Sequence, residues 1–122
     1  MTASTATCIT PDPNAAPPAG ADPARAERFA ERVGGMINDG AVVVMVALGH
    51  QLGLFDAMAA AGRRTSEQLA DRTRLAERYV REWLSVMTTS GIVEYDPAGQ
   101  TFCLPAEHAA CLTRARHRTT WP

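Results

Sequence analysis

The stretch from Thr65 to Leu104 constrains the fold most, because helical and strand patterns follow one another there in a fixed order. Thr65 with Gln68 three residues on is a capping box, in which each side chain accepts from a backbone N–H that the helix start leaves unpaired. Leu69 is the apolar anchor of the short helix that begins there, and the segment from Asp71 to Arg74 is expected to end it. The sequence therefore predicts a first short helix directly after Thr65.

A longer second helix is predicted next, from apolar residues spaced at three, four and seven. Gly91 stands where a helix can end in a left-handed residue. Two short β-type runs, 92–95 and 101–104, then flank the turn Asp96-Pro97-Ala98-Gly99, where Pro fixes φ and Gly tolerates positive φ. The order helix, turn, helix, hairpin predicts a mainly α fold, a winged helix-turn-helix with a two-stranded β wing. The apolar stripe of the second helix, with Tyr79 and Trp83 expected in the core, is Leu75, Tyr79, Val80, Trp83, Leu84 and Met87.

Two interface helices are predicted ahead of the winged helix, within residues 22–62. Asp22 as N-cap and Pro23 as first helical residue open the first of them. Gly34-Gly35 weakens it, at about 1 kcal/mol per Gly relative to Ala. Asp39-Gly40 is expected to separate it from a second helix starting near Ala41, along which two further glycines, Gly49 and Gly53, permit close helix approach.

The run from Ala41 to Leu48 is apolar on all sides, so it must be covered on more than one side. It is too short to span a bilayer, which takes roughly 20 apolar residues. The winged helix alone is too small to cover it, so we expect either a homodimer partner or a missing domain. The residues predicted to form the dimer interface are Val42, Val44, Met45, Leu48 and Leu52.

Charge argues against a nucleic-acid partner. The net charge of the chain is −1, and residues 63–104 contain six Arg against six acidic residues, whereas DNA-binding domains show a basic footprint. Arg78 and Glu82 stand four residues apart and are expected to form an ion pair on a solvated face. A DNA-binding regulator remains the alternative, with contacts from the second helix of the winged helix. The candidate contacts are Arg74, Arg78 and Arg81.

Patterns for a self-contained active site are missing from the sequence. No G-x-G loop occurs, the three cysteines have no C-x-x-C spacing, and nothing pairs a nucleophile with a base. His50 is interpreted as a hydrogen-bonded interior or interface residue, His108 as exposed and Cys103 as a small core residue. We therefore predict no catalytic, cofactor-binding or metal-ligating residue in this chain.

The two ends of the chain have different compositions. Residues 1–21 have almost no large apolar side chain and are predicted to be a disordered arm without a signal peptide. Residues 105–112 suggest a short helix that closes a winged-helix domain of residues 63–112. Residues 113–122, which include His117, show no periodicity. The unpaired cysteines fit a reduced, cytoplasmic chain with no membrane partner.

Three strings carry a family resemblance: GHQLGLFD at 49–56, ERYVREWL at 77–84 and LPAEHA at 104–109. Over about residues 24–115 the chain resembles the N-terminal winged-helix domain of actinobacterial class I S-adenosylmethionine-dependent methyltransferases. The resemblance implies that residues 22–62 pair subunits and that the domain helps to close a pocket for a small-molecule substrate. It also implies that a following Rossmann-like domain would bind S-adenosylmethionine.

The chain departs from this family pattern at three points. Ala76 replaces a capping Asn or Ser, and Arg74 replaces a turn Gly. The catalytic domain of the family is expected to be missing, and a shifted reading frame over residues 116–122 can encode Ala-Pro-Asp-Asn-Leu-Ala, which the resemblance gives as typical of the family. We therefore expect a frameshift near residue 115 and a fragment that neither binds S-adenosylmethionine nor turns over. A nonfunctional truncated product, prone to aggregate through its exposed apolar helix, is a third reading.

Overall fold

A computed structural model describes residues 12–16 and 18–114 of the chain. The chain divides into two units, residues 1–34 and 35–122, and each is described by itself. Most of the predicted arm, the tail from residue 115 and His117 lie outside the described residues. The described part of the arm, 12–16 and 18–21, contains turns and no helix or strand.

In the first unit, Asp22 and Pro23 open α1 (Pro23–Gln51) as predicted. The Asp22 side chain acts as the cap, because its Oδ1 accepts from the backbone N–H of Ala24 at 3.0 Å. The apolar residue Phe29 is 65% exposed on this part of the helix.

The predicted helix break at Asp39-Gly40 is wrong, because α1 continues through both residues to Gln51. Each helical Gly costs only about 1 kcal/mol relative to Ala, which weakens a helix without ending it. The chain turns instead at Gly53, whose φ of 72° is a left-handed conformation, and α2 (Leu54–Ala61) begins directly after it. Two helices therefore precede the winged helix, but their boundary lies later in the chain than the sequence suggested.

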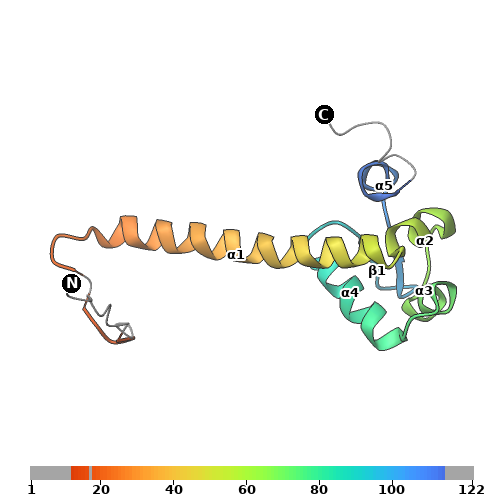
Figure 1. Cartoon of the computed structure of the whole chain (residues 1–122), viewed down its shortest axis with the longest axis horizontal. Helices are drawn as coiled ribbons and strands as arrows, with labels where there is room; N and C mark the ends of the chain where they lie inside the picture. The colour runs from red at the N-terminus through yellow and green to blue at the C-terminus, as the bar shows by residue number, and fades with distance from the viewer. Residues whose placement is uncertain (1–11, 17, 115–122) are drawn as a thin grey trace, which may run out of the picture. The chain divides into compact units, whose positions relative to one another are not determined.

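The helix-turn-helix consists of α3 (Ser66–Thr73) and α4 (Glu77–Thr89) (Figure 1). The capping box is confirmed: Thr65 Oγ1 accepts from the N–H of Gln68 at 3.2 Å, and Gln68 Oε1 accepts from the N–H of Thr65 at 3.0 Å. α3 runs past Asp71 and ends at Arg74, which adopts a left-handed φ of 57°. The prediction that the segment from Asp71 to Arg74 ends this helix is therefore confirmed.

Ser66 joins the two helices of this motif. Its buried hydroxyl donates to Glu77 Oε1 at 2.8 Å, at the first residue of α4. Ala76, the N-cap of α4, forms no side-chain cap hydrogen bond, as its side chain predicts.

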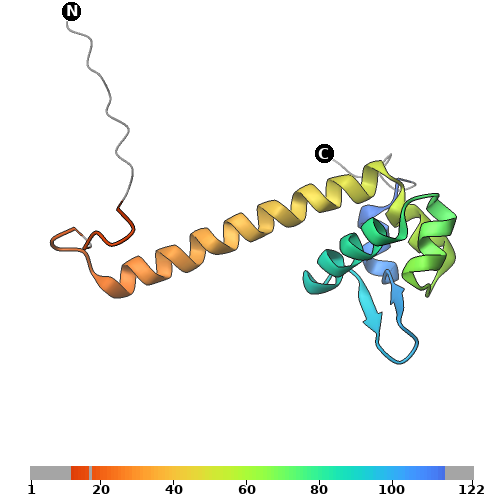
Figure 2. The same cartoon turned by 90° about the horizontal axis from the view of Figure 1, so that it is seen from below.

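The wing is an antiparallel pair, β1 (Glu94–Asp96) and β2 (Thr101–Cys103) (Figure 2). In its register, Tyr95 lies opposite Phe102. Phe102 also exchanges two backbone hydrogen bonds with Arg64, at 2.7 and 3.1 Å. In the turn, the positive φ falls on Gln100 (51°) and not on Gly99, which corrects the predicted role of that glycine.

Two further predictions about the winged helix are confirmed. Gly91 adopts the predicted left-handed φ, at 75°, and the closing helix is α5 (Ala106–Leu112). Cys103, predicted as a small core residue, is only half-buried and lies outside the core, so that prediction is wrong.

The core lies where α4 meets α2, α3 and the wing. Trp83 is 2% exposed and packs edge-on against Phe55, with ring centroids 5.1 Å apart. Tyr79 was expected beside it but is 73% exposed, because it lies in the first turn of α4, where none of the described residues covers it. The buried hydrophobic residues are Leu54, Phe55, Met58, Leu69, Ala70, Val80, Trp83, Leu84, Met87, Val93 and Leu104.

Candidate functional site

The last turns of α1 pack tightly against α4 through a glycine. Gly49 is buried, and a Cβ at that position would lie 2.4 Å from Cζ2 of Trp83. Trp83 Nε1 donates to the carbonyl of Met45 at 2.9 Å, one helical turn before Gly49. Only a residue without a side chain permits this approach, so Gly49 fixes where α1 crosses α4.

Arg114 fastens the C-terminal end of α1. Its Nη2 donates to the carbonyls of His50 and Gln51 at 2.7 and 2.9 Å. Its backbone N–H donates to Asp56 Oδ1 at 3.0 Å, and its Nε lies 3.8 Å from Asp56 Oδ2. A cation at the C-terminal carbonyls of a helix is favourable, because the helix dipole is negative there. Sequence reasoning missed this contact, since its partners are separated by 58 to 64 residues.

The prediction that His50 is hydrogen-bonded is confirmed. Its Nδ1 lies 3.4 Å from the carbonyl of Leu112 in α5, and the side chain is half-buried. His108 is exposed as predicted, and its Nδ1 lies 2.7 Å from the carbonyl of Ile92. Each imidazole ring thus contacts a backbone carbonyl of a different segment of the chain. These contacts indicate a structural role for both histidines.

An open apolar groove of about 260 Å³ lies between the end of α1 and the start of α4. Three of its residues are largely uncovered: Leu48 is 40% exposed, Leu52 44% and Tyr79 73%. Val43 and Val44 continue the exposed apolar surface along α1, at 64% and 67%. We call the groove and these two valines the α1–α4 apolar surface. The residues that line the groove are Leu48, Leu52, Leu54, Leu75, Ala76, Tyr79, Val80 and Trp83.

The predicted interface residues therefore fall into two groups. Val44, Leu48 and Leu52 are exposed on the α1–α4 apolar surface. Met45 packs against the core of its own chain, because its carbonyl accepts from Trp83, and Val42 is half-buried. A partner could bury the first group without disturbing the fold of this chain.

By length and composition, α1 is also long and apolar enough to cross a membrane, with a mean hydropathy of 1.4 over its most apolar stretch. A helix that packs against protein in a soluble domain passes the same test. Its last turns make such contacts here, through Gly49 and Trp83.

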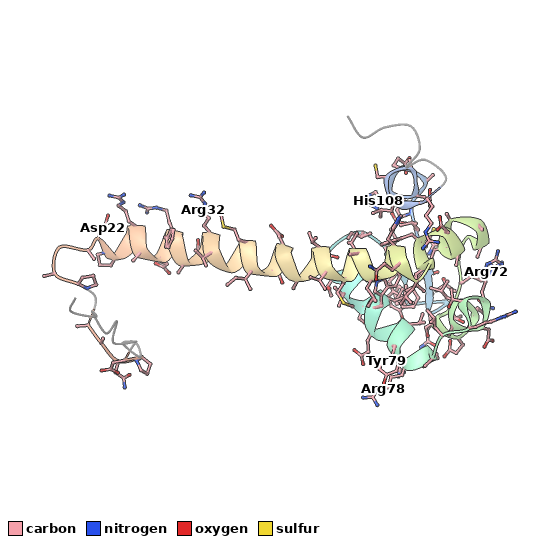
Figure 3. The ribbon with its side chains drawn as sticks, viewed as in Figure 1. Asp22, Arg32, Arg72, Arg78, Tyr79 and His108 are labelled. Atoms are coloured by element: carbon pink, nitrogen blue, oxygen red, sulfur yellow. The ribbon has the colours of Figure 1, made fainter. Side chains whose placement is uncertain are left out.

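The candidate DNA contacts Arg74, Arg78 and Arg81 are all exposed. Arg78 and its neighbour Tyr79 point away from the other helices of the winged helix (Figure 3). The ion pair on α4 joins Arg81 to Glu77, with Nε 3.7 Å from Oε1, and replaces the predicted pair of Arg78 with Glu82. The face therefore presents arginines interleaved with acidic residues.

Within residues 12–16 and 18–114, no group of three or more His, Cys, Asp or Glu side chains is placed to hold a metal ion. The strands of this part of the chain form one antiparallel pair, so no glycine-rich loop follows a parallel strand.

Fold and surface together define a winged helix-turn-helix domain with an uncovered apolar face. The chain belongs to the family of Rv2258c-like winged HTH domains, whose model matches residues 40–114. No curated protein sequence matches it.

Two solved structures of larger proteins are similar to this chain. One is the mitomycin 7-O-methyltransferase MmcR, at 22% identity and a TM-score of 0.63, covering 73% of this chain and 26% of that one. The other is PigF with SAH, at 21% identity and a TM-score of 0.58, covering 69% of this chain and 24% of that one. The matched part is the N-terminal part of those chains, and this chain spans about a quarter of their length.

Proposed function

We propose that this chain is the subunit-pairing and pocket-closing part of a small-molecule methyltransferase, and that it acts in the cytoplasm. The observation that carries the proposal is the α1–α4 apolar surface, which the described residues leave open. The similarity to the N-terminal part of an O-methyltransferase supports the same assignment. A domain that pairs subunits needs such a surface.

The energetics favour association through this surface. Burying a Val or Leu side chain contributes about 1.5–3 kcal/mol, so Val44, Leu48 and Leu52 together favour a partner by several kcal/mol. Contiguous exposed apolar residues on a soluble domain mark interaction sites. A second copy of the chain is the simplest partner, because one self-complementary surface then serves both subunits.

Sedimentation equilibrium of the purified chain tests this proposal. We expect a dimer for the unaltered chain and a monomer for Val44→Glu, because each Glu would be buried without a partner. Ala60→Glu on α2 is the matched control, since it adds the same charge to an exposed position outside the groove. A sedimentation profile that Val44→Glu leaves unchanged would contradict the proposal.

In the parent enzyme, cofactor binding would belong to a different domain from this one. S-adenosylmethionine would be held by a catalytic domain of the parent enzyme, and the described residues of this chain supply no ligand to it. Calorimetric titration of this chain with S-adenosylmethionine should give no heat. Measurable binding would contradict the proposal that S-adenosylmethionine binds only to the catalytic domain.

A DNA-binding regulator is the second candidate, favoured by the exposure of Arg78 and Arg81 on α4 of the winged helix. Tight binding by several phosphate contacts would weaken steeply with salt. We expect only weak retardation in a mobility-shift assay, because Glu77 and Glu82 share that face. Tight, salt-sensitive binding that Arg78→Ala with Arg81→Ala abolishes would favour the regulator instead.

A further inference from the structure

A second groove lies between α4 and the wing, on a different part of the winged helix from the α1–α4 apolar surface. Its main cavity is about 360 Å³, within the range of small-molecule sites. An adjoining cavity of about 200 Å³ shares Arg81, Tyr95 and Phe102 with it. The main cavity is lined by Arg81, Ser85, Thr88, Thr89, Tyr95 and Phe102.

One wall of this groove is aromatic and held in place. The rings of Tyr95 and Phe102 lie 4.8 Å apart with their planes at 37°. The backbone of Phe102 is fixed on both sides, by its strand partner Tyr95 and by two hydrogen bonds to Arg64. Such a wall offers stacking area to a planar ring at little cost in side-chain entropy.

The opposite wall, on α4, is polar. Ser85 Oγ donates to the carbonyl of Arg81 at 2.9 Å, and Thr89 Oγ1 donates to that of Ser85 at 2.9 Å, so both hydroxyls offer only lone pairs outward. Thr88 Oγ1 is buried and has no hydrogen-bond partner. A buried hydroxyl without a partner is uncommon, because leaving it so costs its desolvation. Because it is buried, the Thr88 hydroxyl is not available to a molecule in the groove, and the exposed lone pairs of Ser85 and Thr89 are the polar groups of this wall.

Charge limits what the groove can hold. Arg81 is the charged residue of the main cavity, and its Nε lies beside Glu77. Glu67 lines the adjoining cavity, where its own backbone N–H and then the Thr65 hydroxyl hold the pKa of its carboxyl below the usual value. With carboxylates so close to the one arginine, a polyanion such as a nucleic acid is disfavoured, whereas a single negative charge can be placed beside Arg81.

From this arrangement we infer that the groove between α4 and the wing binds a planar hydroxyaryl carboxylate. The ring system stacks on Tyr95 and Phe102, and the carboxylate faces Arg81. The phenol end lies near Thr88 and Thr89. These residues are about 10 Å from Arg81 along the axis of α4, because an α-helix rises about 1.5 Å per residue. The phenol O–H donates to a lone pair of the Thr89 hydroxyl, whose own proton is used by the Ser85 carbonyl.

The test uses 6-hydroxy-2-naphthoate, a flat two-ring probe with its polar groups at opposite ends. Binding to the full chain is followed by amide chemical-shift changes in two-dimensional NMR, which also show where the probe lies. We expect saturable binding with shifts at α4 and the wing. The neutral analogue 6-hydroxy-2-naphthamide should bind roughly tenfold more weakly, because it lacks the charge-assisted hydrogen bond to Arg81.

Three variants distinguish specific binding in this groove from non-specific binding of the probe. Arg81→Gln should weaken the naphthoate roughly tenfold and make it bind no better than the amide. Thr89→Val keeps the shape and removes the hydroxyl that accepts from the phenol, so it should weaken binding. Arg78→Gln, an exposed arginine of the same helix outside the groove, is the matched control and should change nothing.

The inference is overturned if the naphthoate does not bind at millimolar concentration, or if amide and acid bind equally. It is also overturned if the shifts fall on the α1–α4 apolar surface, or if Arg78→Gln weakens binding as much as Arg81→Gln. These outcomes leave the pairing proposal untouched, because that proposal rests on sedimentation of Val44→Glu.

Discussion

Replacing Gly49 by Ala should destabilise the domain, although Ala is the better helix former. The new Cβ would lie 2.4, 2.7 and 2.9 Å from three atoms of the Trp83 indole, whereas non-bonded heavy atoms prefer about 3.5–4.0 Å. The indole would have to move by about 1 Å, the shortfall in that contact distance. It is 2% exposed, packed on Phe55 and hydrogen-bonded to the Met45 carbonyl, so any such movement would disturb both contacts.

The magnitude follows from three terms. Overpacking a tight core costs about 1–3 kcal/mol, and loss of the Trp83 to Met45 hydrogen bond costs about 1 kcal/mol. The better helix propensity of Ala returns about 1 kcal/mol. We expect a net loss of about 2 kcal/mol. Gly40→Ala on the same helix is the matched control, because a Cβ there meets no atom within 4 Å and should stabilise by about 0.5–1 kcal/mol.

Urea unfolding followed by far-UV circular dichroism measures both variants at one protein concentration, since association would shift the midpoint. A Trp121→Phe background leaves Trp83 as the one tryptophan, so its emission reports whether the indole has moved. If Gly49→Ala unfolds at the same urea concentration as the unaltered chain, or shifts in the same direction as Gly40→Ala, the close helix crossing does not exist.

Three further substitutions test separate features by the same unfolding measurement. Arg74→Gly should stabilise the domain by about 0.5–1 kcal/mol, because Gly adopts the observed φ of 57° without the strain that a side chain causes; a loss would refute that reading of the turn. Arg114→Gln should cost about 1 kcal/mol through the two α1 carbonyls it leaves unpaired, while the exposed Arg72→Gln should cost nothing measurable, and equal effects would sink the assignment. Thr65→Ala should cost about 1 kcal/mol as a lost N-cap of α3, whereas Thr65→Ser should retain most of it, and an Ala as stable as Ser would contradict the capping box.

The elements that could be predicted from the sequence are those specified by neighbours in the chain. The capping box needs only Thr65 and Gln68, and the left-handed end at Gly91 needs only the absence of a side chain. Of the six residues predicted for the apolar stripe, four are buried on α4, Tyr79 is exposed, and Leu75 is half-buried and precedes the helix. Burial of the Tyr79 side chain depends on whether α1 extends over the first turn of α4. The spacing of apolar residues within α4 cannot reveal this.

The groove between α4 and the wing lay beyond sequence reasoning for a related reason. Arg81, Tyr95 and Phe102 belong to different elements, and their meeting depends on the hairpin register and on the bonds from Arg64 to Phe102. Thr88 gave no signal at all, because a Thr inside a helix normally donates to a carbonyl one turn back, as Thr89 does. Only the folded chain shows that its hydroxyl is left without a partner.

Gly49 and Gly53 are two glycines four positions apart, and they have unrelated roles in the structure. Both were expected to permit close helix approach. Gly49 does so, because Trp83 lies against it, whereas a Cβ at Gly53 would meet nothing within 4 Å. Gly53 instead supplies the φ of 72° that ends the α1 segment and starts α2. Ala is therefore unfavourable at Gly49 because of its contact with Trp83, 34 residues away in sequence, and at Gly53 because of the positive φ. Asn tolerates positive φ, so Gly53→Asn should reduce the stability of the fold only slightly.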